Sequence, residues 1–579
     1  MCSSSKKIGI FDLSQYHDSV NGYSARNMKW IDINRVKAAV KSFGTLFWDG
    51  RGDPRYMVPA DQHTSSIFAA GLWVGGYDDN NTLYFSGERY NQQGYDYYPG
   101  PLTVDEYGEP GTIDYPVMAS FNRVWKIDRH DLGVFAYNHY NNIPYDVPAD
   151  IAQWPGNGPQ GCSALLAPFI DNNEDGLYNI ADGDMPDIIG DQMLWWVTND
   201  VAAPHTESGG NSMGIEVQYS LYAYVYVNPP TVYSDLVNYQ TWLRIKLINR
   251  SDRNYHSVYM GLFVDGDLGN PTDDYVGSDV EHNSFYFYNG DHFDEDYMGN
   301  TGYGVNPPVQ TITVLKSPLL DPNGIDDDGD GTIDNEQTGM SRFMYYNYAG
   351  GVPATTDPNS AESCYSYLTG YWLDGQPLCY GGTGHPSGGG NSEIPCNYMF
   401  PGDTDPNFNG TPAMLVGDWS EETSGNPSGD RRGVCSMGPV HLDSNEVVEI
   451  DVLFGFIPYS QQRSGKFDYT PKLDTLISWY RNGNIPSNYA AANQLPVPVH
   501  TRAPLVLVYP NPASDYVIIQ TDDKMSKITL CDVGGNELTA FQPGSSFFRI
   551  SCAALASGVY YLKIETAGAS NVRKLVITD

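Results

Sequence analysis

Short runs in which apolar and polar residues alternate limit most strongly how this chain can fold. The clearest run spans residues 215–227, and its apolar face carries Ile215, Val217, Tyr219, Leu221, Ala223, Val225 and Val227. A period of two places successive side chains on opposite faces of a β-strand. Two similar runs follow at residues 239–247 and 258–264 after short connections. The sequence therefore predicts three antiparallel strands in one sheet of a sandwich.

Composition favours the same class of fold along the rest of the chain. Glycine, proline and tyrosine are abundant, at 60, 39 and 44 residues. This mixture is typical of many short strands joined by long, structured loops. We predict an all-β protein with a large β-sandwich-type body, long Gly/Pro/Asp-rich loops and a small C-terminal Ig-like β-sandwich. The helix that the sequence predicts spans residues 471–481, where Leu473, Leu476 and Ile477 share a face with Tyr480.

The C-terminal residues 508–579 have a pattern of their own. Short runs rich in Val, Ile and Tyr alternate there with turn residues, which predicts a small sandwich of about seven strands. Three landmarks stand in this stretch: Tyr509-Pro510-Asn511-Pro512-Ala513, the turn Asp532-Val533-Gly534-Gly535-Asn536, and Gly558-Val559-Tyr560-Tyr561-Leu562-Lys563 followed by Arg573-Lys574-Leu575-Val576. Together they resemble the C-terminal sorting domain of cargo of the bacterial type IX secretion system.

The resemblance implies an export route. Such cargo crosses the periplasm and reaches the cell surface or the medium, and the sorting domain contacts the secretion machinery. Cargo of this kind first needs a signal peptide, yet the apolar stretch after Met1-Cys2-Ser3-Ser4-Ser5-Lys6-Lys7 is too short for one. We therefore expect the true start to lie upstream. The family also implies removal of the sorting domain on arrival.

Composition shifts predict four segments. Residues 1–28 are polar and weakly patterned, so we expect them to be loosely ordered. Residues 29–483 form the β-rich body, as one subdomain or two. Prolines are frequent in residues 484–507, which predicts a linker. Residues 508–579 form the sorting domain.

The charge balance excludes some partners. With 70 acidic and 32 basic residues, the net charge is −38. Such a surface repels phosphate backbones, so we expect no nucleic-acid partner. It suits hard cations such as calcium, although an acidic surface also keeps exported proteins soluble. The sequence has no apolar run of the length that a transmembrane helix needs.

The eight cysteines lack the spacing of a zinc ribbon. An oxidising periplasm permits disulfides. Cys364, Cys379 and Cys396 share one Gly-rich segment, so we predict that a bridge forms among them. Their connectivity stays open.

The body contains a second series of motifs. They are Leu72-Trp73-Val74-Gly75-Gly76, Tyr97-Tyr98-Pro99-Gly100-Pro101-Leu102, Arg123-Val124-Trp125-Lys126-Ile127 and Trp154-Pro155-Gly156-Asn157-Gly158. Over roughly residues 29–460 the order of these motifs is similar to the body of large, uncharacterised type IX cargo proteins. This resemblance implies no established activity.

Residues 171–182 have the spacing of a calcium loop. Oxygen-bearing side chains stand at positions 1, 3, 5, 9 and 12, with Gly176 at position 6: Asp171, Asn173, Asp175, Asn179 and Asp182. This spacing is that of an EF-hand loop, although position 12 is Asp rather than Glu. Flanking helices are not evident, so we predict a stand-alone calcium loop. The alternative is a surface loop rich in Asx-turns.

A second acidic stretch spans residues 323–336. Its carboxylates are Asp326, Asp328, Asp330 and Asp334, and the pattern Asp-x-Asp-x-Asp-Gly-x-x-Asp resembles thrombospondin type 3 calcium repeats. Without a cation, carboxylates this dense would repel one another. We predict a second calcium loop.

A third acidic stretch follows the strand at 258–264. Asp265, Asp267 and Asp273 lie in it, together with Asp274. They could form a third calcium site, the paired carboxylates of a glycosidase, or a capped and solvated loop. The sequence leaves these three readings open.

Taken together, these patterns predict a secreted or cell-surface protein with a calcium-stabilised, non-catalytic structural or adhesive body. Neither a His-Glu-x-x-His motif nor a recognisable Cys/His signature is present, and we name no catalytic residue. The alternative is a carbohydrate-binding or glycoside hydrolase-like protein. Its ligand would be a glycan or a surface protein.

Overall fold

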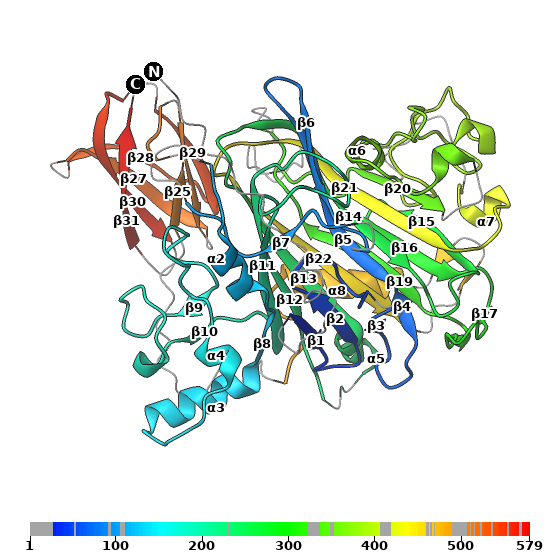
Figure 1. The fold of residues 1–579 in the computed structure, drawn as a ribbon, viewed down its shortest axis with the longest axis horizontal. Helices are drawn as coiled ribbons and strands as arrows, with labels where there is room; N and C mark the ends of the chain where they lie inside the picture. The colour runs from blue at the N-terminus through cyan, green and yellow to red at the C-terminus, as the bar shows by residue number, and fades with distance from the viewer. Residues whose placement is uncertain are drawn as a thin grey trace. The chain divides into compact units, whose positions relative to one another are not determined.

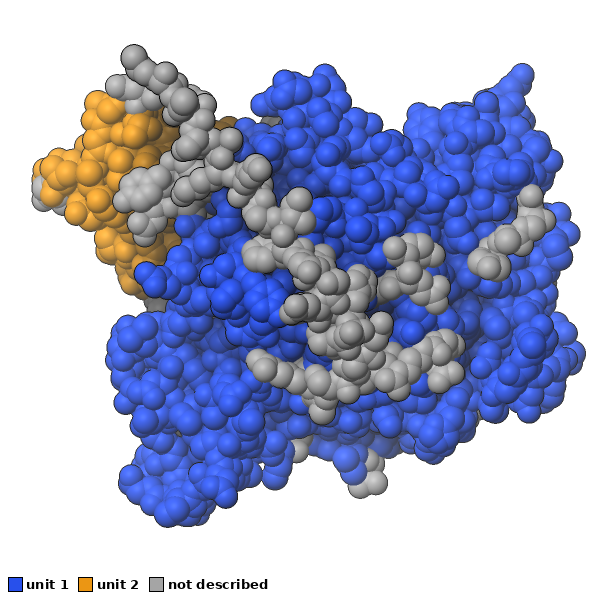
Figure 2. Space-filling model, viewed as in Figure 1, with its two compact units in different colours: residues 1–318, 337–493 blue, residues 319–336, 494–579 orange. Residues whose placement is uncertain are grey.

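The computed structural model describes most of the chain. The described residues are 27–50, 54–90, 94–104, 110–227, 229, 231–321, 336–347, 352–405, 418–458, 462–463, 466–467, 469–488, 506–509, 511–514, 516–521, 524–533, 536–552, 555–566 and 570–578. Two compact units are distinguished (Figure 2): residues 1–318 with 337–493, and residues 319–336 with 494–579. Residues 319–336 had been predicted to belong to the body, as part of residues 29–483.

The body is built on a nine-stranded antiparallel sheet (Figure 1). Its strands, in spatial order, are β15 (Asp274–Asp279), β16 (Ser284–Asn289), β19 (Val309–Lys316), β22 (Val447–Ile457), β13 (Gln240–Asn249), β12 (Ile215–Ala223), β11 (Gln192–Asn199) and β7 (Tyr98–Pro99), and β8 (Trp125–Asp128) also pairs with β11. The alternation at 215–223 and 240–249 is thus confirmed as two paired strands. The predicted strand is longer than β12, which ends at Ala223.

A five-stranded sheet forms the second layer of the body (Figure 1). Its order is β20 (Arg342–Asn347), β21 (Arg431–Leu442), β14 (Tyr255–Gly266), β5 (Ala69–Asp78) and β6 (Leu83–Gly87). The prediction that residues 258–264 continue the sheet of β12 and β13 is wrong, because β14 pairs with β5 and β21 instead. The free side of β13 is taken by β22.

Both sheets contribute to one buried core. A single cluster of buried side chains contains residues of both layers, among them Val217, Ile245, Leu262 and Val434. The Phe285 and Phe343 rings, from β16 and β20, stack with centroids 4.8 Å apart. A Cβ atom at Gly433 would lie 2.6 Å from the Phe285 ring, so glycine permits this close approach. The sandwich prediction is confirmed.

Shorter elements surround these layers. A four-stranded sheet consists of β1 (Met28–Ile31), β2 (Lys37–Lys41), β3 (Tyr56–Met57) and β4 (Ser65–Ile67). Two-stranded hairpins are β9 (Phe169–Ile170) with β10 (Met185–Pro186), β17 (Phe293–Asp294) with β18 (Gly304–Val305), and β23 (Gln462–Arg463) with β24 (Lys466–Phe467). The helices are α2 (Tyr115–Phe121), α3 (Arg129–Tyr140), α4 (Ala149–Ala152), α5 (Val232–Asp235), α6 (Ala361–Leu368), α7 (Glu421–Ser424) and α8 (Thr470–Arg481).

The helix α8 confirms the helix predicted at 471–481, and it buries Leu473, Leu476 and Ile477. By contrast, the twelve-residue helix α3 was not predicted. Only Leu132 and Phe135 of α3 are buried, so its sequence lacks the apolar stripe by which a surface helix is recognised. Among the described residues, no helix is long and apolar enough to span a bilayer.

The cysteines of the body are not bridged as predicted. Cys364, Cys379 and Cys396 are all free thiols, and all three are buried. Burial raises the pKa of each of these thiols above its usual value. These cysteines therefore pack as small apolar side chains.

The second unit contains a sandwich of its own, described here by itself. One sheet has the order β25 (Val506–Tyr509), β26 (Tyr516–Thr521) and β29 (Phe547–Ser551), and the other has the order β28 (Glu537–Phe541), β27 (Met525–Cys531), β30 (Gly558–Thr566) and β31 (Ser570–Ile577). Val517, Ile528, Leu562 and Leu575 belong to its core. The predicted seven-stranded C-terminal sandwich is confirmed.

Candidate functional site

The first predicted calcium loop lies inside a β-hairpin. The strands β9 and β10 pair antiparallel and close the loop between them. Glu174 and Gly176 have positive φ angles of 60° and 78°, so the chain turns tightly in the first half of the loop. The loop is therefore held by two short strands and not by the helices of an EF-hand.

Three of the predicted ligand residues form hydrogen bonds in this first half. The Gly176 N–H donates to Asp171 Oδ2 at 2.7 Å, and the Asn173 side-chain amide donates to Asp175 Oδ2 at 3.0 Å. The Asp175 N–H in turn donates to Asn173 Oδ1 at 3.2 Å. The second oxygen of Asp171, Oδ1, is buried and accepts no hydrogen bond. An unsatisfied buried carboxylate oxygen calls for a donor or a cation.

The other two predicted ligands are engaged with each other. Asn179 Nδ2 donates to Asp182 Oδ2 at 2.5 Å, while Asn179 Oδ1 caps the short 3-10 helix η1 (Ile180–Asp182). Asp184, which the sequence analysis did not single out, is fully buried and accepts the N–H groups of Asn172 and Asn179, each at 2.8 Å. Asp184 therefore fastens both ends of the loop.

The second predicted calcium loop lies outside the described residues. Asp326, Asp328, Asp330 and Asp334 all fall within residues 322–335, which the structure does not describe. The calcium prediction for residues 326–336 stays a prediction.

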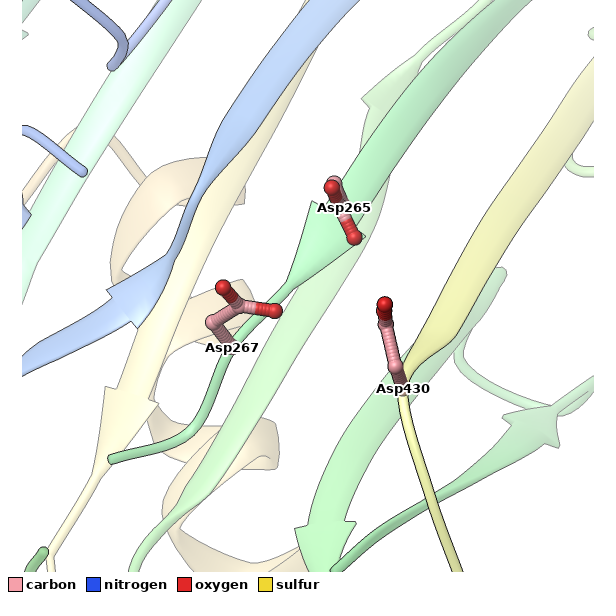
Figure 3. Close-up of side chains that lie close together, drawn as sticks. All are labelled: Asp265, Asp267 and Asp430. Carbon is pink, nitrogen blue, oxygen red and sulfur yellow. The ribbon is translucent and has the colours of Figure 1, made fainter. Parts of the chain in front are cut away.

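The third acidic stretch divides into two clusters. Asp265 and Asp267, at the end of β14, lie beside Asp430, which immediately precedes β21. One carboxylate oxygen from each of the three lies within 4.8 Å of the others. Figure 3 shows an oxygen of each side chain directed into the space between them. Asp273, the other predicted ligand of this stretch, is not part of this group.

Strand register explains why these three carboxylates meet. In the pairing of β14 with β21, Asp265 stands opposite Arg432, and Gly266 opposite Arg431. Continuing this antiparallel register by one residue places Asp267 opposite Asp430. Since side chains alternate between faces, Asp265, Arg432, Asp267 and Asp430 share one face, and Arg431 lies on the other. Like charges directly opposite each other destabilise a strand pair.

Only part of this negative charge is compensated. Tyr90 donates its hydroxyl to Asp265 Oδ2 at 2.6 Å, and Arg432 reaches Asp265 Oδ2 at 3.4 Å and Asp430 Oδ1 at 2.6 Å. Asp265 Oδ1 is buried and accepts no hydrogen bond. Burial raises the pKa of Asp265 to about 7. Burial, followed by the charge of Asp265, raises the pKa of Asp267 well above its usual value.

Asp273 belongs to a separate group with Asn270 and Asp294. The Asn270 side-chain amide donates to Asp273 Oδ2 at 2.9 Å, and the Asn270 N–H donates to Asp294 Oδ1 at 3.0 Å. Burial, followed by the neighbouring carboxylates, raises the pKa of Asp273 to about 7, and burial raises that of Asp294 to about 6. Asp273 Oδ1 is buried without a hydrogen-bond partner.

Another buried carboxyl was not singled out from the sequence. Glu88 is fully buried at the end of the β6 segment, and neither of its side-chain oxygens accepts a hydrogen bond. Burial, then the charges of Glu207 and Asp96, raise the pKa of Glu88 well above its usual value. Nothing in the local sequence marks this glutamate, because only the fold brings Glu207 and Asp96 close to it.

The replacement Glu88→Gln tests this buried acid. A raised pKa means that the folded state keeps a proton that the unfolded state releases above about pH 4.5. The stability of the native protein should therefore fall as the pH rises from about 4.5 toward the raised pKa, by up to about 1.4 kcal/mol per pH unit from this group. We expect the variant to gain stability relative to the native protein between pH 5 and 8, as measured by denaturant unfolding. Parallel pH profiles would contradict this expectation.

A serine and a histidine also lie close together in the body. Ser212, in Gly210-Asn211-Ser212-Met213-Gly214, has its hydroxyl 3.3 Å from His205 Nε2. However, Nε2 also lies 2.8 Å from the Asp200 carbonyl oxygen, and Nδ1 lies 2.9 Å from the Phe85 carbonyl oxygen. A carbonyl oxygen only accepts hydrogen bonds, so an Nε2–H directed at the Asp200 carbonyl leaves that nitrogen no lone pair with which to activate the serine. The arrangement is structural.

Two landmarks of the C-terminal sequence have structural roles in the second unit. The Asn511 side chain accepts the Val576 N–H and donates to the Lys574 carbonyl, each at 2.8 Å, so it fastens the start of the unit to β31. In the turn after β27, Asp532 accepts both the backbone N–H and the side-chain amide of Asn536, each at 2.9 Å. Both motifs are thus side-chain clamps on turns of the sandwich.

The similarity of this chain to solved structures is weak. A polysaccharide lyase is similar over 66% of this chain and 38% of its own length, with 7% identity and a TM-score of 0.17. PorZ, an essential bacterial surface component of the type-IX secretion system of Porphyromonas gingivalis, is similar over 95% of this chain and 75% of its own length, with 11% identity and a TM-score of 0.13. The chain therefore spans well under half of that lyase. No curated protein matches this chain.

The C-terminal unit has a clear relative. Residues 507–578 match the family described as the secretion system C-terminal sorting domain. This match confirms the resemblance drawn from the three sequence landmarks, and it covers β25 to β31. The chain is therefore cargo of the type IX secretion system, carrying the C-terminal sorting domain that directs it to the cell surface or the extracellular space.

Proposed function

We propose that this chain is an exported surface protein whose body is stabilised by calcium and has a structural or adhesive role without catalysis. The observation that carries this proposal is the loop at residues 171–182. There Asp171, Asn173 and Asp175 form hydrogen bonds within a tight turn, and one oxygen of Asp171 is buried without a hydrogen-bond partner. Carboxylate and amide oxygens are ligands that calcium favours.

The hydrogen bond from the Gly176 N–H to Asp171 supports this reading. It holds the first ligand residue over the turn while leaving Asp171 Oδ1 available to a cation. Glu174 and Asp175 are exposed, so an ion could enter from solvent without opening the fold. Extracellular calcium modules bind with dissociation constants of roughly 10⁻⁴–10⁻³ M.

The alternative, a glycoside hydrolase-like activity at Asp265 and Asp267, has weaker support. Such enzymes need one protonated acid and one ionised carboxylate, whose pKa values are driven apart by their surroundings. Here burial raises the pKa of both residues. A hydrolysis assay on plant and bacterial polysaccharides, with Asp265→Asn as the comparison, tests the alternative directly.

Calcium should stabilise the body through the 171–182 loop. At about 1 mM calcium, a dissociation constant of roughly 10⁻⁴–10⁻³ M gives about 0.4–1.4 kcal/mol of stabilisation per site. For a body of this size we expect a rise in Tm of about 1 °C per site. Magnesium should act weakly, because it requires a tighter octahedral shell. Thermal unfolding in EDTA, calcium and magnesium measures the effect.

Matched variants within the loop assign the effect to it. Asp171→Ala and Asp175→Asn should each reduce the calcium-dependent rise in Tm. Glu174→Gln should preserve the calcium-dependent rise, since the exposed Glu174 side chain stands at a non-ligand position of the same loop. An equal calcium response in all four proteins would reject the 171–182 loop as a calcium site.

A further inference from the structure

We infer that Asp265, Asp267 and Asp430 together bind a divalent cation of the calcium class, which links the end of β14 to the start of β21. This site is separate from the 171–182 loop, and its failure would leave the proposal for that loop intact. Asp430 was not among the ligands predicted from the sequence. The inference rests on the geometry, charge and hydrogen bonding of the three carboxylates.

The spacing of the oxygens suits one ion. One oxygen of each carboxylate lies within 4.8 Å of the other two, and Figure 3 shows these groups facing a common space. Calcium binds oxygen at about 2.3–2.6 Å, so two ligands on opposite sides of one ion stand roughly 4.6–5.2 Å apart. A magnesium shell, at about 2.0–2.1 Å, is narrower. The three oxygens therefore fall within the reach of calcium.

Charge provides the driving force. Three carboxylates face one arginine, Arg432, whose guanidinium contacts Asp265 and Asp430. The charge of a further carboxylate, Asp357, also raises the pKa of Asp265. The Oδ1 atom of Asp357 is buried without a hydrogen-bond partner. One positive charge cannot balance this group, whereas a divalent cation would convert the repulsion between Asp267 and Asp430 into shared coordination.

The hydrogen bonding of Asp265 points independently to a missing ligand. Asp265 is only 2% exposed, and its Oδ2 is occupied by the Tyr90 hydroxyl at 2.6 Å and approached by Arg432. Its Oδ1 is equally buried but accepts nothing. A buried carboxylate oxygen is rarely left without a partner. Tyr90 thus engages Oδ2 and leaves Oδ1 as the oxygen without a hydrogen-bond partner.

The position of the site also allows an ion to enter. The Asp430 side chain is 34% exposed, while Asp265 is enclosed, so the group opens to solvent on the Asp430 side. Calcium takes six to eight oxygens, and water can supply those that the three carboxylates do not. The ion would join two strands that are far apart in the sequence but adjacent in the five-stranded sheet.

The test compares Asp430→Asn with the native protein in EDTA and in calcium. In EDTA the variant should be as stable as the native chain or more so, because the repulsion between residues 267 and 430 is relieved. In calcium it should be less stable, because a charged ligand is lost. Asp430→Asn and Asp265→Asn are each also made in an Asp171→Ala background and titrated with calcium. Relative to Asp171→Ala alone, each should lose one binding event or bind calcium about tenfold or more weakly.

The sign of the change separates a cation site from a purely structural ion pair. If Asp430 served only to pair with Arg432, its replacement would lower Tm equally in EDTA and in calcium, and that result would overturn the inference. An unchanged calcium stoichiometry in Asp265→Asn would also overturn the inference. The inference would fall as well if the native protein hydrolysed a glycan without any cation and Asp265→Asn lost this activity. Asp252→Asn, at an exposed pair on the same unit, should change none of these measurements.

Discussion

A chain that ends before residue 507 should fold normally and accumulate in the periplasm, and almost none should reach the cell surface. The core of the body is built from residues between Ile31 and Phe456, so this truncation removes none of its buried side chains. What it removes is the sorting domain, which has its own core and carries the signal that the type IX machinery reads. Cell fractionation and surface protease accessibility measure the effect.

Point variants separate the sorting signal from the mere length of the chain. Leu562→Asp places a charge in the core of the sorting domain and should block export as the truncation does. Val572→Ala changes a side chain that is 58% exposed on β31 and should be exported normally. Normal surface levels of the truncated chain would show that residues 507–578 are dispensable for export.

Replacing Arg431 by leucine should destabilise the body by about 3–5 kcal/mol, because it leaves a buried glutamate without its partner. Arg431 forms two hydrogen bonds of 2.9 Å with Glu421, and both side chains are almost completely enclosed. Glu421 also accepts the Val276 N–H at 3.0 Å, so the pair joins α7, β21 and β15. Equilibrium unfolding in denaturant measures the loss.

The pH dependence of this loss follows from the burial of Glu421. Even with Arg431 beside it, burial raises the pKa of Glu421. Without the arginine this pKa should rise further, and the folded variant then takes up a proton that the unfolded chain releases above about pH 4.5. The destabilisation should therefore be smaller at pH 5 than at pH 8.

Two comparisons make the test of Arg431 specific. The double variant Arg431→Leu/Glu421→Leu removes both charges and should recover much of the lost stability. Asp252→Asn, in an exposed pair with Arg253 whose atoms are 3.9 Å apart, should have little effect. A cost as small for Arg431→Leu as for Asp252→Asn would show that the buried pair contributes little.

The sequence determined the elements whose environment repeats locally. Alternation marked β12 and β13, and an apolar stripe marked α8. Turn residues and short strands defined the C-terminal sandwich, and its landmarks Asn511 and Asp532 prove to be clamps on turns. In each case the information lies within a few neighbouring residues, since periodicity and turn chemistry are local properties.

Tertiary structure alone decided which strands pair and which side chains meet. Alternation tells which face of a strand is buried but not which strand lies beside it, so β14 could be placed in the wrong sheet. For the same reason Asp430 was not predicted, because its carboxylate meets Asp265 and Asp267 only through the register of β14 and β21. Asp273 was predicted beside Asp265 and Asp267, but it does not belong to their group. Pairing between distant strands depends on the packing of whole sheets, and no local pattern encodes it.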